Sequence, residues 1–505
     1  MIELDGSSLT VELARRVVFD GEPVRPAPAA LERVQASYEV LARAAASGRP
    51  IYGVNTGFGK LSDRLIPPEE QGALQENLLR SHAAGVGEPL PEEAVRAVLL
   101  FRLNALLKGY SGVRPKLIGH LVELLNRGVC PRVPAKGSVG ASGDLAPLAH
   151  LALVLIGEGE ATVEGERLPG REALRRVGLE PLKLEPKEGL ALINGTQVSL
   201  AEGFLAYLRA ERILRHAELL TALALEGWGG RLEPLDPKLH EVRPHPGQRE
   251  VAARILELLR GSRLLGRAGE VQDPYSLRCA PQILGATRDA LEFVRGKLEL
   301  EMNSATDNPL VFPETGEVLS GGNFHGQPLA LALELLGQAT AEVGSLAERQ
   351  INLLLSAPGL PEFLAARPGL TSGLMLAQYT AAALVSENKV LAHPAAVDSI
   401  PTSAGKEDHN SLSSLAAQKA QKIAANVEYI LAIGLLVAAW AVELRGPAAM
   451  APATRRIYER IREAVGPRPE QDQPLTPKVE RLRELIAEEA LLDVDGRGST
   501  EDGCR

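Results

Sequence analysis

Three small residues in the first third of the chain, Ala141, Ser142 and Gly143, could react with one another. Gly143 has no Cβ, so a turn here can be tight enough for its amide nitrogen to approach the Ala141 carbonyl carbon. Attack would close a five-membered ring. Loss of one water from the ring carbon and of another through the Ser142 hydroxyl would leave a methylidene group conjugated to an imidazolone. That group is a strong electrophile, which no ordinary side chain provides.

The residues after this tripeptide favour the same chemistry. Asp144 is a suitable N-cap, and Leu145 to Ile156 has the composition of a helix. Unpaired amides and the positive end of the helix dipole would then lie near the ring. The alternative is an ordinary Gly/Ser-rich loop before a helix, which is what a bare Ala-Ser-Gly usually indicates. The longer run from Gly137 to His150 favours the reactive interpretation.

The run reads Gly-Ser-Val-Gly-Ala-Ser-Gly-Asp-Leu-Ala-Pro-Leu-Ala-His, and it resembles the signature of the aromatic amino acid ammonia-lyases. The resemblance implies a methylidene-imidazolone group (MIO) formed from Ala141, Ser142 and Gly143, with no external cofactor. It extends from a loop around Tyr52 to a segment around Glu407, which is nearly the whole chain. A carbon–nitrogen lyase is therefore expected.

Loss of ammonia from an amino acid requires a base as well as an electrophile, because the β-hydrogen is barely acidic. In the family the base is a Tyr on a glycine-rich loop, and Tyr52 in Tyr-Gly-Val-Asn-Thr-Gly-Phe-Gly matches it. By itself Tyr52 could equally be a loop residue that covers the core. A phenol acts as a base only if its pKa, near ~10, is lowered by neighbouring dipoles or cations.

The resemblance adds further residues to the site. Arg278 corresponds to the carboxylate anchor, a role that suits a guanidinium because it binds a carboxylate bidentately and keeps its charge. Asn194 corresponds to an amide beside the MIO, although alone it could simply start the following helix. The remaining residues implied to line the site are Gln272, Tyr275 and Phe324, of which Tyr275 is the second candidate for the base.

Two residues bear on the choice of substrate. In phenylalanine-specific members of the family, the position of His82 is apolar and that of Glu407 is a neutral amide. An imidazole has two nitrogens that need partners, so a His and a carboxylate suit it. The alternative for Glu407 is an ordinary carboxylate at a helix start. Next to Glu407 the chain has Gly405 and Lys406, where Asn-Gln is more usual in histidine-specific members of the family.

Composition excludes several classes of function. Of the 505 residues, 45% are hydrophobic and only 4% aromatic, which is typical of a helical core built from Leu, Ala and Val. The net charge of −9 and the lack of a Lys/Arg-rich block argue against a nucleic-acid surface. A small-molecule partner is expected instead.

Cysteines and apolar runs indicate the compartment. The 3 cysteines are widely spaced and match neither a disulfide framework nor a zinc motif, so no metal is expected. The most apolar run, Tyr429 to Val442, is shorter than the ~20 residues that span a bilayer, which favours a buried core helix. The N-terminus lacks the pattern of a signal peptide. We expect a cytoplasmic protein without a membrane partner.

The first part of the chain predicts short elements. These are a strand and a helix within Ile2 to Val18, helices over Ala29 to Ala46, Pro68 to His82, Pro91 to Leu107 and Arg114 to Arg127, and a hairpin over Glu160 to Leu168. Helical periodicity then extends over Gln197 to Trp228, Pro281 to Ser304, Gly326 to Ser356 and Ser411 to Arg445. Helices of that length with Ala/Leu faces normally pack as a bundle and can bury apolar surface against other subunits.

The expected fold is therefore mainly α. A smaller, mostly helical domain over residues 1–196 carries the Ala-Ser-Gly loop, and a long-helix bundle occupies residues 197–492. Residues 493–505 form a polar tail that is predicted to be disordered. The length of the helices and the resemblance together predict a homotetramer whose active sites draw on more than one chain.

The favoured hypothesis is conversion of L-histidine to trans-urocanate and ammonia, the first step of histidine degradation. A lyase or aminomutase acting on tyrosine or phenylalanine is the nearest competitor, and His82 and Glu407 argue against it. A non-catalytic helical scaffold would keep the fold without forming MIO. The fumarase and aspartase type of helical tetramer is disfavoured, because its Ser-rich loop with Met-Pro-x-Lys is absent.

Overall fold

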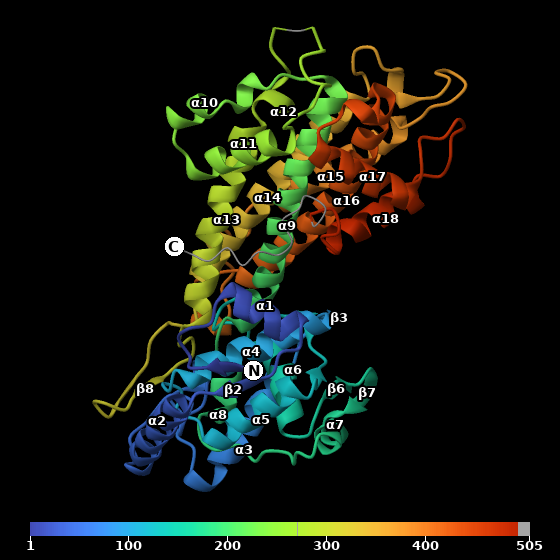
Figure 1. Ribbon diagram of the computed structural model, residues 1–505. Helices are drawn as coiled ribbons and strands as arrows, with labels where there is room; N and C mark the ends of the chain where they lie inside the picture. Colours follow the sequence, from blue (N-terminus) through green and yellow to red (C-terminus); the bar gives the residue numbers. More distant parts are fainter. Residues whose placement is uncertain (270, 493–505) are drawn as a thin grey trace. The chain divides into compact units, whose positions relative to one another are not determined.

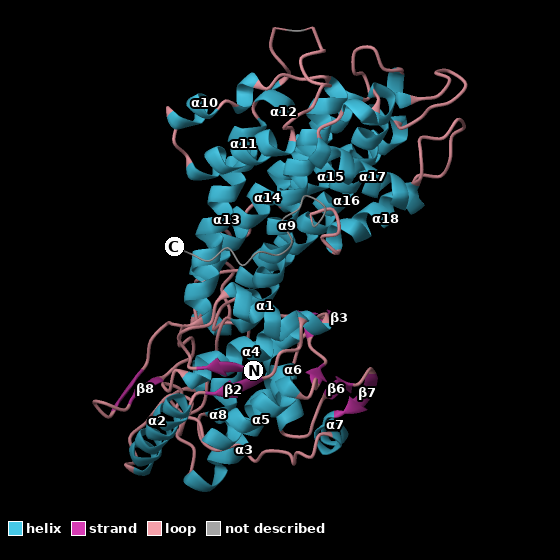
Figure 2. Cartoon of the chain, in the orientation of Figure 1, coloured by secondary structure: helices cyan, strands magenta, loops and turns pink. Residues whose placement is uncertain are grey.

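The computed structural model, which describes residues 1–269 and 271–492, consists mainly of α-helices (Figure 1). Eighteen α-helices occur among these residues, and the strands have only two to four residues each (Figure 2). The mainly α fold that the sequence predicts is thus confirmed.

The chain divides into two compact units. Unit 1 comprises Met1–Leu205, Arg295–Glu334 and Pro394–Gln418; unit 2 comprises Ala206–Val294, Leu335–His393 and the described part of Lys419–Arg505. The sequence predicts a single boundary after residue 196. The division by contacts differs, because two later segments join the N-terminal region and four of the five cuts fall inside long helices. The predicted tail, residues 493–505, lies outside the described residues.

Unit 1 holds all the named strands. Its elements are β1 (Ile2–Leu4), α1 (Val11–Phe19), β2 (Val24–Pro26), α2 (Pro28–Ala46), α3 (Gln71–His82), β3 (Val86–Pro89), α4 (Glu92–Leu107), α5 (Pro115–Asn126), β4 (Cys130–Pro131), β5 (Pro134–Lys136), α6 (Leu145–Leu155), β6 (Glu160–Val163), β7 (Glu166–Pro169), α7 (Gly170–Arg176), α8 (Glu188–Ile193), β8 (Leu310–Phe312) and β9 (Glu317–Leu319). Strands β1 and β2 pair in parallel; β3–β5, β4–β6–β7 and β8–β9 are antiparallel.

The predicted hairpin is present as β6 and β7, which pair from Glu160 to Pro169. Its two turn residues, Glu164 and Gly165, have φ values of 50° and 80°. Positive φ at both positions is the conformation that matches the twist of two antiparallel strands joined by a two-residue turn.

Helix α4 forms the interior of unit 1. From Ala94 to Leu107 every residue except Arg96 is buried, so this helix is covered on all sides. Two of the buried residues are polar: Arg102, which is 1% exposed, and Asn104. The Asn104 amide donates to the Met302 carbonyl oxygen (2.8 Å), which ties a later segment of the chain to this helix.

Unit 2 is helical throughout its named elements. Besides parts of the long helices α9 (Gln197–Trp228), α13 (Ala280–Met302), α14 (Gln327–Leu354) and α16 (Ser413–Arg445), it contains α10 (Pro237–Glu241), α11 (Pro246–Leu258), α12 (Tyr275–Arg278), α15 (Met375–Leu391), α17 (Pro452–Val465) and α18 (Thr476–Ala487). The four long helices match their predicted ranges to within two residues at each end.

Glycines allow these helices to approach closely. A Cβ at Gly434 of α16 would lie 2.6 Å from a methyl carbon of Leu220 on α9, and one at Gly344 of α14 would lie 2.9 Å from Val427 on α16. Both distances are shorter than a van der Waals contact, so a larger residue would force the helices apart. Small residues at these positions therefore set the spacing of the bundle.

Among the described residues, α16 is the one helix long and apolar enough to cross a membrane. Its apolar stretch exceeds the run from Tyr429 to Val442 that the sequence singles out. However, 83% of its most apolar window is buried inside the protein. Such burial is the environment of a core helix.

Candidate active site

The Ala-Ser-Gly loop of unit 1 ends at the first turn of α6, where it pairs with a second loop. Gly143 forms a parallel bridge with Gly195, and the Asp144 N–H donates to the Gly195 carbonyl oxygen (2.7 Å). Gly143 has a φ of +74°, and a Cβ there would lie 2.1 Å from that oxygen. Both the left-handed backbone and the close approach require glycine at this position.

Ser142 lies between two of the predicted site residues. Its hydroxyl donates to Glu407 Oε1 (2.8 Å), and its carbonyl oxygen accepts from Asn194 Nδ2 (2.8 Å). Asn194 is 3% exposed, and its Oδ1 is buried without a hydrogen-bond partner among the described residues. The structure thus brings together the side chain that would be dehydrated, an amide with a free acceptor and an ionisable carboxyl.

Glu407 is fixed by its own loop. Its Oε2 accepts from Thr402 Oγ1 (2.7 Å), and the two backbones form an antiparallel bridge. The departure at Gly405 and Lys406 falls between them, in and after a single 3₁₀ turn, Ser403–Gly405. The Glu407 carboxyl still reaches Ser142, so this departure leaves the carboxyl at the tripeptide.

Asp144 occupies the N-cap position of α6, as predicted, but its carboxylate does not cap that helix. It accepts from the Ser199 N–H (2.7 Å), the Ser199 hydroxyl (2.9 Å) and the Ser138 hydroxyl (2.8 Å). Ser199 is the third residue of α9, where N–H groups have no partner within the helix. The predicted capping of α6 is therefore wrong: Asp144 binds the start of α9. Burial raises the pKa of the Asp144 carboxyl, and these hydrogen bonds oppose that shift.

Helix N-termini gather around the loop. Helix α6 begins directly after it, and α9 begins two residues after Gly195. A Cβ at Gly140 would lie 3.2 Å from the Ser413 N–H nitrogen at the start of α16 and 2.2 Å from the Ser411 hydroxyl. The positive ends of these helix dipoles favour negative charge on groups at the loop.

His82, at the C-terminal end of α3, belongs to the same region. Its Nδ1 lies 3.0 Å from the Ser81 hydroxyl. Burial lowers the pKa of His82, while a hydrogen bond to the Leu78 backbone and, to a smaller extent, the Glu407 carboxylate act against that shift. The Glu407 carboxylate thus lies near enough to His82 to favour the charged form of its ring.

The Tyr52 loop lies against the loop of Glu407. The Tyr52 hydroxyl accepts from the Gly59 N–H (3.1 Å), and the ring makes an edge contact with Phe58. A Cβ at Gly59 would lie 2.9 Å from the Ser403 hydroxyl, four residues before Glu407. No hydrogen bond joins Tyr52 to the tripeptide among the described residues.

Phe324 lies in a segment adjoining the same loop. The next residue, His325, has its Nε2 3.1 Å from the His409 carbonyl oxygen, and a Cβ at Gly326 would lie 2.5 Å from the Ser413 hydroxyl. Phe324 itself is half-buried.

The other three predicted residues belong to unit 2. Gln272, Tyr275 and Arg278 line one pocket of about 480 Å³ there. The Arg278 guanidinium lies over the Tyr275 ring, 4.7 Å from its centroid. Its Nε is buried without a partner among the described residues, whereas Tyr275 is 69% exposed. A guanidinium with unused donors beside an exposed ring is suited to bind an anion.

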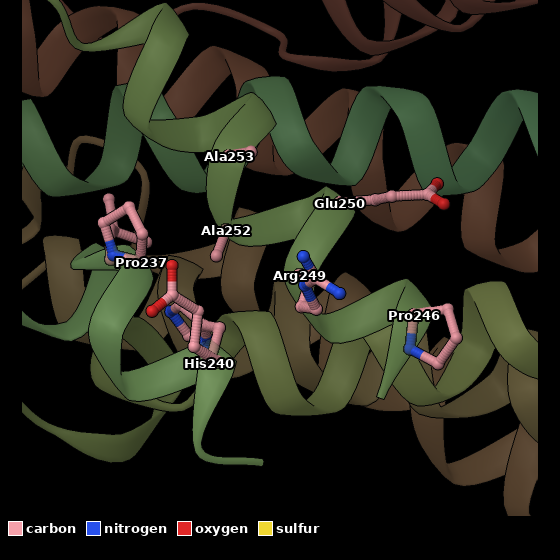
Figure 3. Close-up of a pocket in the computed structure, with 9 residues that line it drawn as sticks. Pro237, His240, Pro246, Arg249, Glu250, Ala252 and Ala253 are labelled. Carbon is pink, nitrogen blue, oxygen red and sulfur yellow. The ribbon is translucent and has the colours of Figure 1, made fainter. Parts of the chain in front are cut away.

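A second pocket of unit 2, of about 370 Å³, is lined by residues between Leu235 and Ala253 (Figure 3). Its histidine, His240, is fully engaged: Nε2 lies 3.1 Å from the Pro234 carbonyl oxygen and Nδ1 lies 3.0 Å from the Gln248 amide. Glu250 forms an ion pair with Arg288. His240 and Glu250 are thus both bound to other groups of unit 2.

Comparison of the sequence with known proteins identifies its family. The family described as aromatic amino acid lyase matches residues 9–463. The chain belongs to the aromatic amino acid lyase family. It is 52% identical to a histidine ammonia-lyase of Geobacillus thermodenitrificans, with 98% of each chain covered, and 49% identical to one of Bacillus subtilis, with 97% of each covered.

Solved structures of similar proteins agree with this membership. A tyrosine aminomutase from Streptomyces globisporus aligns over 100% of both chains with a TM-score of 0.94 and 39% identity. A histidine ammonia-lyase from Trypanosoma cruzi aligns with a TM-score of 0.91 and 40% identity, over 98% of this chain and 95% of that one. The family predicted from the sequence is thus confirmed.

Sequence reasoning missed several residues that support the site of this lyase. Ser199 and Thr402 hold Asp144 and Glu407, and Arg102 binds the loop that carries Asn194. Serine and threonine give no distinctive signal, but Arg102 does, since it interrupts the apolar run from Ala97 to Leu107. In residues 1–269 and 271–492 of the lyase, no group of three His, Cys, Asp or Glu side chains could hold a metal ion.

Proposed function

We propose that this lyase eliminates ammonia from L-histidine to give trans-urocanate, the first step of histidine degradation. The observation that carries the proposal is the position of Ser142, bound by Asn194 on one side and by Glu407 on the other. Relatives about half identical to this chain over nearly their full length are histidine ammonia-lyases, which supports the same substrate. A histidine and a carboxylate, as at His82 and Glu407, suit the two nitrogens of an imidazole ring.

The electrophile would be MIO, formed from Ala141, Ser142 and Gly143 without an added cofactor. The Gly143 nitrogen bonds to the Ala141 carbonyl carbon. The Ala141 carbonyl oxygen then leaves as water with two protons, one from the Gly143 N–H and one from the Ser142 N–H. A second water takes the Ser142 hydroxyl and its Cα proton, so no oxidant is needed. The left-handed turn at Gly143 and the unused Asn194 Oδ1 fit such a group. When formed, MIO supplies an electrophilic carbon that no side chain has.

Side chains of the protein abstract the proton and bind the substrate. Tyr52 takes the β-proton of the substrate, and Glu407 with His82 holds the imidazole nitrogens. Arg278 binds the carboxylate through its unused donors, with Gln272, Tyr275 and Phe324 lining the site. The positive helix ends near the loop stabilise negative charge there.

Several exposed apolar residues support the homotetramer with shared sites. On unit 2, Val271 is 87% exposed and Tyr275 69%, and on α15 Tyr379 is 59% exposed and Val390 76%. Apolar surface of this kind is stabilised when a second copy covers it. A cytoplasmic location, with a small-molecule substrate and no nucleic-acid or membrane partner, completes the proposal.

The intact mass and an ultraviolet assay test the function together. The purified chain is expected to weigh roughly 36 Da less than its sequence, the mass of two waters. L-Histidine should give the absorbance of a conjugated acid, while phenylalanine and tyrosine should give little. A mass equal to that of the sequence would refute MIO formation. A modified protein that prefers phenylalanine or tyrosine would keep MIO but overturn the substrate.

The substrate preference itself can be shifted. In a double variant, His82→Leu with Glu407→Gln, the kcat/KM for histidine should fall relative to that for phenylalanine. Each ring nitrogen left unpaired costs on the order of 1 to 3 kcal/mol, so the ratio is expected to change by ~10-fold or more. Asp408→Asn, which removes the neighbouring carboxylate, is the matched control and should leave the ratio unchanged. Because Glu407 binds Ser142, a substitution there could affect formation of MIO, so the intact mass of each variant is measured first. An unchanged ratio in the modified double variant would contradict the selectivity argument.

A further inference from the structure

A buried cation contacts the turn that carries Asn194, the residue whose side chain binds the Ser142 carbonyl. Arg102 of α4 is 1% exposed, and none of its hydrogen bonds within residues 1–269 and 271–492 goes to a carboxylate. Its Nη1 donates to the Ala191 carbonyl oxygen (3.1 Å), and its Nη2 donates to the Asn194 carbonyl oxygen (3.1 Å) and to Gln197 Oε1. Burial lowers the pKa of Arg102 to about 10, although the Asp307 and Asp144 carboxylates act against that shift, so the guanidinium remains charged at neutral pH. Burying a charge without an ion-pair partner is costly, which suggests a specific role.

The guanidinium fixes the turn from Asn194 to Gln197. A Cβ at Gly195 would lie 2.4 Å from Arg102 Nη2 and 2.5 Å from Gln197 Oε1. Gln197 is held in turn, because its Nε2 donates to Thr306 Oγ1 (2.8 Å). The end of α8 and the start of α9 are thus tied to one side chain, with no room between that side chain and the backbone at Gly195.

The same turn holds the Ala-Ser-Gly loop. Asn194 Nδ2 donates to the Ser142 carbonyl oxygen, and the Gly195 carbonyl oxygen accepts from the Asp144 N–H. A Cβ at Gly143 would overlap the Gly195 carbonyl group. Asn194 therefore accepts from Arg102 through its backbone carbonyl and donates to Ser142 through its side chain, while Gly195 packs against Arg102 and accepts from the Asp144 N–H.

We propose that Arg102 is a positioning residue for ring closure. By fixing the Asn194 and Gly195 peptides, it sets where the Ser142 carbonyl and the Gly143–Asp144 peptide lie, and so how often the Gly143 nitrogen meets the Ala141 carbonyl carbon. Holding two reacting atoms in place is what makes an intramolecular step fast. Arg102 touches neither reacting atom. The inference rests on the proposed formation of MIO, and the experiment separates the two.

Two variants weaken the hydrogen bonds of the Arg102 side chain to different degrees. Arg102→Lys keeps the charge but has one nitrogen for three acceptors. Arg102→Met also removes the charge and leaves the carbonyl oxygens of Ala191 and Asn194 without that donor. The fraction of purified chains lighter by two waters should fall, several-fold in Arg102→Lys and further in Arg102→Met. Activity per modified chain should stay within about threefold of wild type, because Arg102 acts on formation of the ring rather than on turnover.

Arg96 provides a matched control on the same helix. Its guanidinium also donates three hydrogen bonds, here all to backbone carbonyls, those of Val17, Val18 and Leu125, and none of these belongs to the turn. Arg96→Met should lower the melting temperature while leaving the chain fully modified. Melting temperatures of all three variants are measured alongside intact masses, so that modification is compared at equal stability.

Each outcome has a distinct meaning. A fully modified Arg102→Lys protein, or Arg96→Met chains that are unmodified to the same extent at the same melting temperature, would overturn the role of Arg102. If Arg102→Met does not fold, Arg102→Lys decides. A wild-type chain with its full sequence mass would instead refute MIO formation itself. Slow growth of the light species when purified Arg102→Lys is incubated would further support a positioning role.

Discussion

Tyr52→Phe is expected to lower kcat by ~10² or more, the usual scale for loss of a general base, while the chain stays lighter by two waters. Among the described residues, the Tyr52 hydroxyl takes part in one hydrogen bond, which it accepts from the Gly59 N–H. Its loss should cost only about 1 kcal/mol of folding stability, so the fold and the MIO should survive. The measurement combines the intact mass, the melting temperature and the rate of urocanate formation.

Tyr38→Phe is a suitable control for this variant. The Tyr38 hydroxyl donates to Glu185 Oε2 (2.6 Å), elsewhere in unit 1, so the substitution also removes one hydrogen bond of a half-buried tyrosine. Its turnover should match that of wild type. If Tyr52→Phe were equally active, the base would have to be another residue, and Tyr275 would be the next to replace.

Long helices were predictable because their signal is local. Apolar periodicity sustained over some thirty residues identifies α9 and α16 almost to the residue. The hairpin at Glu164 and Gly165 was predictable for the same reason, since a two-residue turn needs no information from elsewhere in the chain. The motif residues around Ser142 are recognisable in the sequence because they resemble the signature of a family.

What the sequence did not reveal depends on contacts between distant segments. The sequence predicts that Asp144 caps the helix that follows it, yet its carboxylate binds Ser199, 55 residues later. Both are reasonable partners for a buried carboxylate, and only the tertiary fold chooses between them. The assignment of later segments to unit 1 has the same origin, because contacts such as that of Asn104 with Met302 span nearly 200 residues.

The partners of buried charged residues could not be predicted from the sequence either. Nothing in the sequence around Arg102 identifies the carbonyls of Ala191 and Asn194 as its partners. The same holds for Lys187 and Asp307, a buried ion pair (2.6 Å) 120 residues apart. A charged residue within an apolar run signals that a partner exists, but it does not identify that partner.

Subunit mixing is expected to restore activity to two inactive variants. Ser142→Ala cannot form the methylidene group, and Arg278→Ala lacks the proposed carboxylate anchor, so each parent should be nearly inactive. Ser142 belongs to unit 1 and Arg278 to unit 2. If each active site takes these two residues from different chains of the homotetramer, random mixing regenerates both intact residues in about a quarter of the sites.

The two variants are co-expressed with different tags, the mixed oligomer is isolated through both tags, and it is assayed on histidine. A mixture made after purification of the separate proteins, without subunit exchange, serves as the control and should stay inactive. Recovery towards about a quarter of wild-type activity would support sites shared between chains, since no single parent chain holds both residues. Because a site built from one chain always lacks either the Ser142 hydroxyl or the Arg278 guanidinium in such a mixture, activity no higher than that of the parents would assign both residues to the same chain.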